Sequence, residues 1–347
     1  MENQSDVNTL SVENDNLSIN YHNRAIKVYD VPEAFKKLPQ NGTHEKFKHL
    51  QYFEQIISDH IQGYAQYQNN NKHSYLFTHN FSAQSKLTAH KKGSYLLRTD
   101  SPDQKDTKCF LISKDWDHCG GIQTMGRFIL VPCESGNTSV IFFFDMEYNE
   151  NANHVLHYDN NGKLQSVFPH RAASIGITNV RISNVNYYLL LVCAVSGTVT
   201  IESWCHVYIA RDTGLVNAVI YSYIGKFFLK NDDKSHNIAL DCQGIGLVTD
   251  SKDENVYLIA LHSYMDISYD DWAFLFKLNI KLGGNASISA DRVDSRHLIS
   301  KGGVSGQAGT HFRWGSGIHI TPDGKLALLA TSRNIIAGTF LDTNYWK

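Results

Sequence analysis

Five short segments along the chain each open with a residue that could bind a metal ion or a polar ligand. These residues are His60, His118, His170, Asp241 and His311, and each precedes a turn with glycine or serine and then an apolar run. Neutral imidazole is a good ligand for zinc, copper and iron, and carboxylate suits manganese. If the fold brings these side chains together, they would hold a divalent transition metal, either Fe, Zn, Cu or Mn.

The openings recur at intervals of roughly 50 to 70 residues, longer than the roughly 40 to 50 residues of common blade repeats. Strand-like apolar runs follow each one, such as residues 128–131 and 188–192, and Asn-Gly, Asp-Gly and Gly-Gly pairs mark turns. Short strands of this kind cannot bury both faces alone, and radial stacking solves that problem. The repeat therefore predicts an all-β fold, a five-bladed β-propeller.

The two ends of the chain predict how the ring closes. The last unit has three strand candidates before the chain stops, and residues 24–31 form an unassigned strand candidate. Pairing the two would give N-to-C strand closure and remove an unpaired edge. Apolar residues three and four apart predict one N-terminal helix over residues 44–57. The polar residues 1–22 predict a flexible tail, and residues 23–347 a single propeller domain.

Composition argues against several classes of protein. The formal net charge is -2 and the lysines are scattered, which gives no electrostatic footprint for nucleic acid. No apolar run reaches the roughly 20 residues of a membrane span, and the N-terminus lacks the pattern of a secretory signal, so we expect a cytoplasmic protein. The six cysteines stand singly, which favours buried free thiols over disulfides or a zinc site.

The innermost strand of a propeller blade runs along the central axis, so the repeat openings should converge at the mouth of a funnel. Polar or aromatic side chains near them are candidates for binding a small molecule or a carbohydrate. They are Gln62, Gln123, Arg171, Gln243, Arg313 and Trp314. They could equally be rim residues facing water, and Trp314 could be a packing residue.

The histidines also have a structural interpretation, because a residue that recurs in every unit can hydrogen-bond backbone within its own blade. Against this, Asp241 in the fourth unit keeps the capacity to bind a ligand but would alter a bond that needs a donor. Both interpretations stay open.

The five openings, from His60 to the C-terminus, resemble the β-propeller superfamily. The ring of histidines is similar to the four axial histidines that hold ferrous iron in carotenoid-cleaving oxygenases, which are longer, seven-bladed chains. Five-bladed glycoside hydrolases keep three carboxylates in the funnel. Here the repeat positions include one acidic residue, Asp241, which argues against a glycosidase mechanism.

Two functions follow from this sequence. One is an enzyme acting on a small molecule, in which the axial metal serves as a Lewis acid or activates water or oxygen. The other is a propeller that binds a sugar, a small molecule or a protein without chemistry. The sequence leaves open whether the protein is an enzyme.

Overall fold

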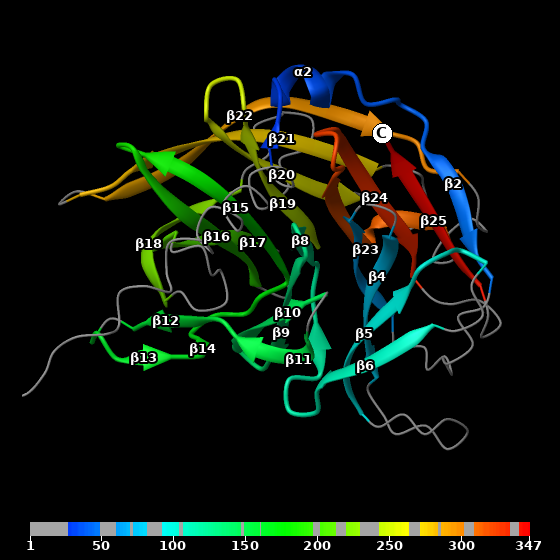
Figure 1. Cartoon of the computed structure of the whole chain (residues 1–347), viewed down its shortest axis with the longest axis horizontal. Helices are drawn as coiled ribbons and strands as arrows, with labels where there is room; N and C mark the ends of the chain where they lie inside the picture. The colour runs from blue at the N-terminus through cyan, green and yellow to red at the C-terminus, as the bar shows by residue number, and fades with distance from the viewer. Residues whose placement is uncertain are drawn as a thin grey trace, which may run out of the picture.

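The protein is nearly all β across the part of the chain that the structure describes (Figure 1). This computed structural model describes residues 27–48, 60–69, 72–81, 92–103, 107–146, 149–159, 161–196, 202–212, 220–229, 243–263, 271–283, 286–301, 309–333 and 340–347. Within those ranges one short helix occurs, α2 (Val31–Lys36). The prediction of an all-β fold is confirmed, whereas the predicted tail over residues 1–22 lies outside the described residues.

The strands follow one another as successive short runs. They are β1 (Lys27–Val28), β2 (Thr43–Phe47), β3 (Ile61–Asn69), β4 (Lys72–Phe81), β5 (Gly93–Thr99), β6 (Lys108–Ser113), β7 (His118–Cys119), β8 (Gln123–Met125), β9 (Phe128–Ser135), β10 (Thr138–Asp145), β11 (Asn149–His154), β12 (Leu156–Tyr158), β13 (Leu164–Gln165), β14 (Val167–Phe168), β15 (Ser174–Ile182), β16 (Val185–Ser196), β17 (Glu202–Arg211), β18 (Ile220–Phe228), β19 (Gly244–Asp250), β20 (Val256–Ser263), β21 (Asp271–Lys281), β22 (Ser287–Leu298), β23 (Thr310–Ile320), β24 (Leu326–Ser332) and β25 (Leu341–Trp346).

Within the described residues these strands form four hydrogen-bonded sheets. Sheet 1 has the order β2-β25-β24-β23-β3-β4-β5-β6, and sheet 2 the order β11-β10-β9-β7 with β14 on β10 and β8 on β9. Sheet 3 has the order β13-β12-β18-β17-β16-β15, and sheet 4 the order β1-β19-β20-β21-β22. Sheet 1 is two runs of four strands, joined between β23 and β3 by one parallel pair, Ser316 with Gly63.

The innermost strands close a ring. Strands β3, β8, β15, β19 and β23 lie in contact with one another in turn, and β23 returns to β3. Every residue of β19 and of β20 is buried, as expected for strands that are covered on both faces. The sheets are arranged round this ring (Figure 1), and the fold is a β-propeller.

The ring is closed by an N-terminal strand, but by a different segment from the one that the sequence indicates. The strand β2 pairs antiparallel with β25, and His44 Nε2 lies 2.7 Å from the carboxylate of Asp342. The segment 24–31 instead contributes β1, which runs parallel to β19, with Lys27 opposite Thr249. The prediction that residues 24–31 complete the last unit is therefore wrong, although a strand from the N-terminal region does cover that edge.

The predicted helix over residues 44–57 is wrong where the structure describes it, because residues 43–47 are β2. Phe47 is buried against Leu341 of β25, so one buried face of a strand produced part of the helical spacing. Residues 49–57 lie outside the described residues. The helix α2 lies earlier, where the carboxylate of Asp250 accepts hydrogen bonds from the backbone N–H groups of Asp30 (3.0 Å) and Val31 (2.8 Å).

One segment crosses from sheet 2 to sheet 3. After β11 pairs with β10, the strand β12 runs parallel to β18, with His157 opposite Tyr221. The chain then returns, and β14 pairs with β10 again at Phe168. Figure 1 shows β12 and β13 beyond the edge of sheet 2, next to β18. The outer edge of sheet 3 is therefore covered by the preceding unit.

The cysteines that the structure describes are all free thiols, as predicted, and Cys242 lies outside the described residues. Burial raises the pKa of Cys119 to about 12, so this thiol stays protonated at neutral pH. The one helix within the described ranges is too short to cross a membrane.

Candidate functional site at the end of the axis

The glycines of the repeat close the central axis. A Cβ atom added at Gly317 would collide with the backbone carbonyl of Tyr64, and one at Gly121 would collide with that of Gln243. At these levels the inner strands approach too closely for side chains to stand between them. Gly121 and Gly317 therefore serve packing, and at their levels the axis has no room for a ligand.

Gln123 fills the axis rather than lining a funnel. Its side chain is 1% exposed, and its amide donates to the carbonyl of Leu247 (2.9 Å). Its oxygen accepts from the backbone N–H groups of Ile177 (2.8 Å) and Leu247 (3.0 Å). The amide thus ties β8 to β15 and β19.

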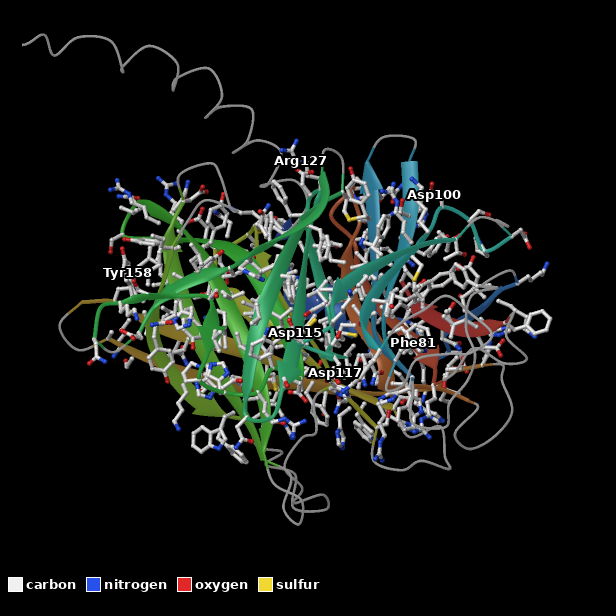
Figure 2. The ribbon with its side chains drawn as sticks, turned by 90° about the horizontal axis from the view of Figure 1, so that it is seen from below. Phe81, Asp100, Asp115, Asp117, Arg127 and Tyr158 are labelled. Atoms are coloured by element: carbon white, nitrogen blue, oxygen red, sulfur yellow. The ribbon has the colours of Figure 1, made fainter. Side chains whose placement is uncertain are left out.

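Two of the predicted histidines meet at the end of the axis. His60 precedes β3 and His118 begins β7, and their ring centroids lie 6.1 Å apart. Both Nε2 atoms face the amide nitrogen of Gln62, at 2.6 Å for His60 and 3.3 Å for His118. Gln62 is itself buried, so it holds the two rings in place from below. Figure 2 shows Asp117, the neighbour of His118, at the opposite end of sheet 2 from Arg127.

The ring of His118 stands between two amides. The amide nitrogen of Gln62 lies 3.3 Å from Nε2, and that of Asn80 lies 3.4 Å from Nδ1. A neutral imidazole has one donor and one acceptor, so the ring can accept from only one of these two amide nitrogens. Burial lowers the pKa of His118 below its ordinary value, against the opposing charge of Glu134. The ring is therefore neutral at pH 7 and can accept a proton.

A buried carboxylate completes this cluster. Glu134 is 4% exposed, lies opposite His118 in the register of β7 and β9, and accepts hydrogen bonds from the guanidinium of Arg171 and the backbone N–H of Ala172 (3.2 Å). One carboxylate oxygen is 3.9 Å from His118 Nε2. A charge in such a site needs a partner, and Arg171 supplies it from the connection between β14 and β15.

Trp314 is already covered by its neighbours. The guanidinium carbons of Arg313 and Arg333 lie 5.3 Å and 4.7 Å from its ring centre, and the ring of His60 meets its edge at 5.6 Å. Trp314 is 8% exposed. Its ring therefore supports His60 and the two arginines and does not offer a bare face for stacking a sugar.

His170 turns away from the other histidines toward sheet 3. Its ring stacks on His206 at 3.9 Å, its Nδ1 donates to the carbonyl of Arg171 (3.0 Å), and its Nε2 accepts from the hydroxyl of Tyr208 (2.8 Å). Burial lowers the pKa of His170 to about 4. Both ring nitrogens have partners within the fold.

His311 is buried between sheets 1 and 4. It is 2% exposed, and its Nδ1 lies 3.7 Å from the carboxylate of Asp271. That carboxylate also accepts from the hydroxyls of Ser263 (2.5 Å) and Ser300 (3.2 Å) and from the N–H of Phe312 (3.1 Å). His311 therefore lies beside a carboxylate of sheet 4, whereas the structural interpretation expects a bond to backbone within its own blade.

The structure thus brings together His60 and His118 and places His170 and His311 elsewhere, while Asp241 lies outside the described residues. Within the described ranges, no group of three or more His, Cys, Asp or Glu side chains is arranged to hold a metal ion. Glu134 is not among the residues predicted from the sequence. The one sign of it there is a carboxylate that follows directly after the apolar residues of β9.

A separate cavity of about 420 Å³ lies between β1, α2 and the turn before β24, where Lys37 and Lys325 contribute to the lining. Lys37 pairs with Glu33 at 3.2 Å and Lys325 with Asp323 at 2.8 Å. These two lysines at its rim are therefore already paired with neighbouring carboxylates.

No family model matches the chain, and no curated protein matches its sequence. Among solved structures, it is similar to a glycoside hydrolase of the GH130 family of mannoside phosphorylases that targets β-1,2 mannosidic linkages in Candida mannan (12% identity, 83% of this chain, 84% of that chain, TM-score 0.47). It is also similar to the hemagglutinin-neuraminidase ectodomain of parainfluenza virus 5 (8% identity, 94% of this chain, 88% of that chain, TM-score 0.39). A third similar structure is an α-L-arabinanase of Penicillium chrysogenum (11% identity, 89% of this chain, 98% of that chain, TM-score 0.37). Function therefore has to be argued from the residues of the site.

Proposed function

We propose that residues 23–347 form a single five-bladed propeller whose axial end binds a small polar ligand. The blade count is supported by the division of sheet 1 at the β23–β3 junction, which gives five runs round the axis together with sheets 2, 3 and 4. The ligand site, here called the axial site, consists of His60, Gln62, His118, Glu134 and Arg171.

One observation carries this proposal. The Nε2 atoms of two histidines from different units face one buried amide, beside a buried carboxylate paired with an arginine. The side chains of His118 and Arg171 are 40% and 47% exposed, whereas Gln62 and Glu134 beneath them are buried. The buried Gln62 and Glu134 thus hold His118 and Arg171 in place. Polar groups placed in this way fix the orientation of a bound ligand.

The side chains define the chemistry of the ligand. The guanidinium of Arg171 is half-exposed, and such a group suits hydroxyl or carboxylate oxygens. His118 is neutral at pH 7, so it can accept a proton from a ligand hydroxyl. Such a pair suits a hydroxylated small molecule, and if the protein is an enzyme, His118 is its candidate general base.

Binding can be tested with His118→Asn, which keeps a polar group but removes Nε2. Monosaccharides, hydroxy acids and nucleosides are screened by thermal shift, and the compound that stabilises the protein most is measured by calorimetry. We expect His118→Asn to weaken it about ten-fold, or about 1.4 kcal/mol. His297→Asn, on the partly buried β22, is the matched control and keeps its affinity. Equal affinity in wild type and His118→Asn would refute the axial site.

A second candidate is a metal-dependent enzyme, and the convergence of the two Nε2 atoms on one point favours it. Here His60 and His118 would hold a divalent transition metal, Fe, Zn, Cu or Mn, after Gln62 turns aside, with Glu134 next to His118 as a further oxygen ligand. Bound metal would supply Lewis acidity to the site.

Elemental analysis of the wild type and three variants tests the metal. His60→Ala and His118→Ala should lose bound metal, whereas His311→Ala, which removes a histidine outside this pair, should retain it. A chelator should change the melting curve of the wild type, and it should leave those of His60→Ala and His118→Ala unchanged. If the wild type binds no metal after loading with each of the four ions, this candidate fails and the binding site remains.

A further inference from the structure

Sheet 3 carries an ordered set of rings next to the axial site. In the register of β17 and β18, Trp204 stands opposite Phe228. His206 stands opposite Lys226, and Tyr208 opposite Tyr223. Residues directly opposite each other, and residues two apart along a strand, share one face of a sheet. These six side chains therefore form one array, here called the aromatic array: Trp204, His206, Tyr208, Tyr223, Lys226 and Phe228.

A β-bulge keeps Tyr223 in this array. Counting back by twos from Phe228 and Lys226 would place Ile224 on the same face, but the register shifts between Val207 and Tyr208. Gly225, with φ of 147°, lies at the shift. Since the shift puts Tyr223 opposite Tyr208, a tyrosine ring takes the place of an aliphatic side chain.

Part of the aromatic array is covered and part is open. Phe168 and His170, which precede β15, pack on the ring of Tyr208, at centroid distances of 5.1 Å and 6.1 Å. Trp204 and Phe228, at the other end, are partly exposed. Tyr223 stands opposite Tyr208 but is itself 42% exposed. Tyr208 is therefore covered, and the other three rings reach solvent.

Polar groups stand between the rings. Lys226 Nζ lies 4.4 Å from the ring centre of Trp204, and His206 stacks on His170 at 3.9 Å. The middle row, His206 and Lys226, therefore separates the row of Trp204 and Phe228 from that of the two tyrosines. Burial lowers the pKa of His206 to about 3, so its ring is neutral at physiological pH.

The aromatic array is continuous with the axial site through two successive residues. His170 stacks on His206 of the array, and the next residue, Arg171, pairs with Glu134 of the axial site. A ligand that contacts both the axial site and the aromatic array would therefore cross from sheet 2 to sheet 3 beside these two residues.

We propose that the aromatic array binds the outer sugar units of an oligosaccharide whose terminal unit occupies the axial site. This inference rests on the proposed function, because it names the ligand class of that site. A sugar ring has a face of C–H groups and a rim of hydroxyls, so it matches rings interleaved with hydrogen-bonding heads. Trp204, Phe228 and Tyr223 supply the apolar faces, and Lys226 and His206 supply partners for hydroxyls.

The competing ligand for an aromatic surface is a proline-rich peptide, which docks on aromatic-lined grooves. The observations favour sugar because the middle row of the array is cationic or polar, and because the adjoining axial site offers a guanidinium and imidazoles suited to hydroxyl oxygens. The proline-rich peptide is an explicit arm of the experiment.

The test uses the full chain and a glycan array with short and long members of each oligosaccharide series. The best series is then measured by calorimetry with the wild type, Trp204→Ala and His118→Asn. We expect the long member to bind the wild type about ten-fold more tightly than the short one. Trp204→Ala should remove that gain and leave the short member unaffected. His118→Asn should weaken both members.

Trp272→Ala is the matched control, because Trp272 is also a partly exposed tryptophan on a third strand and lies outside the aromatic array. It should bind both members as the wild type does. Lys226→Ala removes only an exposed side chain and gives a second test if Trp204→Ala does not fold.

The outcomes separate the two proposals. If short and long sugars bind equally and Trp204→Ala and Lys226→Ala change nothing, the aromatic array is refuted while the axial site stands. Binding of a proline-rich peptide, lost in Trp204→Ala, refutes the sugar assignment. If no sugar binds but a hydroxy acid or nucleoside does so through His118, only this inference fails. If no small molecule binds through His118, the proposed function fails as well.

Discussion

Replacing Gln123 by Met is the sharpest test of how the axis is built. The variant keeps much of the side chain's volume but removes its amide from three backbone groups, which are the N–H of Ile177 and both the N–H and the carbonyl of Leu247. A buried polar group that loses its partner costs about 1 to 3 kcal/mol, so three groups cost about 3 to 9 kcal/mol. This is a large share of the roughly 5 to 15 kcal/mol that stabilises a domain.

The assay is equilibrium unfolding in urea, followed by tryptophan fluorescence, with the midpoint and slope compared between variants. Gln165→Met is the matched control, because Gln165 donates a single hydrogen bond (3.3 Å) to Asp159 in an exposed turn. It should shift the free energy of unfolding by no more than about 0.5 kcal/mol. A loss below about 1 kcal/mol for Gln123→Met would show that the three contacts do not hold the inner strands together. A ligand-binding role for Gln123 predicts that small effect.

Three further predictions concern the rest of the fold. Gly317→Ala should prevent soluble expression or lower the melting temperature sharply, because the new Cβ meets the backbone carbonyl of Tyr64 and backbone cannot move aside as a side chain can. Phe47→Ala should cost about 3 to 5 kcal/mol in urea unfolding by leaving a cavity at the β2–β25 closure, whereas an unchanged midpoint would mean that β2 is dispensable. Because the pKa of His170 is about 4 when folded and about 6.5 when unfolded, the folded state binds fewer protons in that window, and stability should fall as the pH drops through it. His170→Asn should reduce the difference between urea midpoints at about pH 7 and about pH 4.5, and an undiminished difference would rule out His170 as its source.

The repeat predicts the strands well because its signals are local. Apolar runs such as residues 128–131 and 188–192 fall inside β9 and β16, and a turn between strands can be recognised from Asp323 and Gly324 alone. Pairing between distant segments leaves no such mark. Nothing in residues 24–31 distinguishes a strand that joins β19 from one that joins β25, since the choice depends on which edge is open in the assembled ring.

The candidate site was predicted in part for the same reason. The repeat singles out His60 and His118, but it treats His170 and His311 as equivalent to them. Their surroundings differ because of non-repeated residues: Tyr208 and His206 engage His170, and Asp271 engages His311. A sequence period predicts where the backbone goes, whereas the partners of each side chain stand at positions that the repeat does not mark.

The closure of sheet 1 has a consequence for synthesis. His44 and its partner Asp342 are 298 residues apart, so β2 leaves the ribosome long before β25, the strand with which it pairs. At translation rates of about 5 to 20 residues per second, β2 waits roughly 15 to 60 seconds for β25. During that time the early strands can pair with one another, but the edge of β24 that later pairs with β25 stays unpaired. We therefore expect chaperones to bind and proteases to cleave nascent chains arrested before β25, and the synthesis of β25 to release the protein from both.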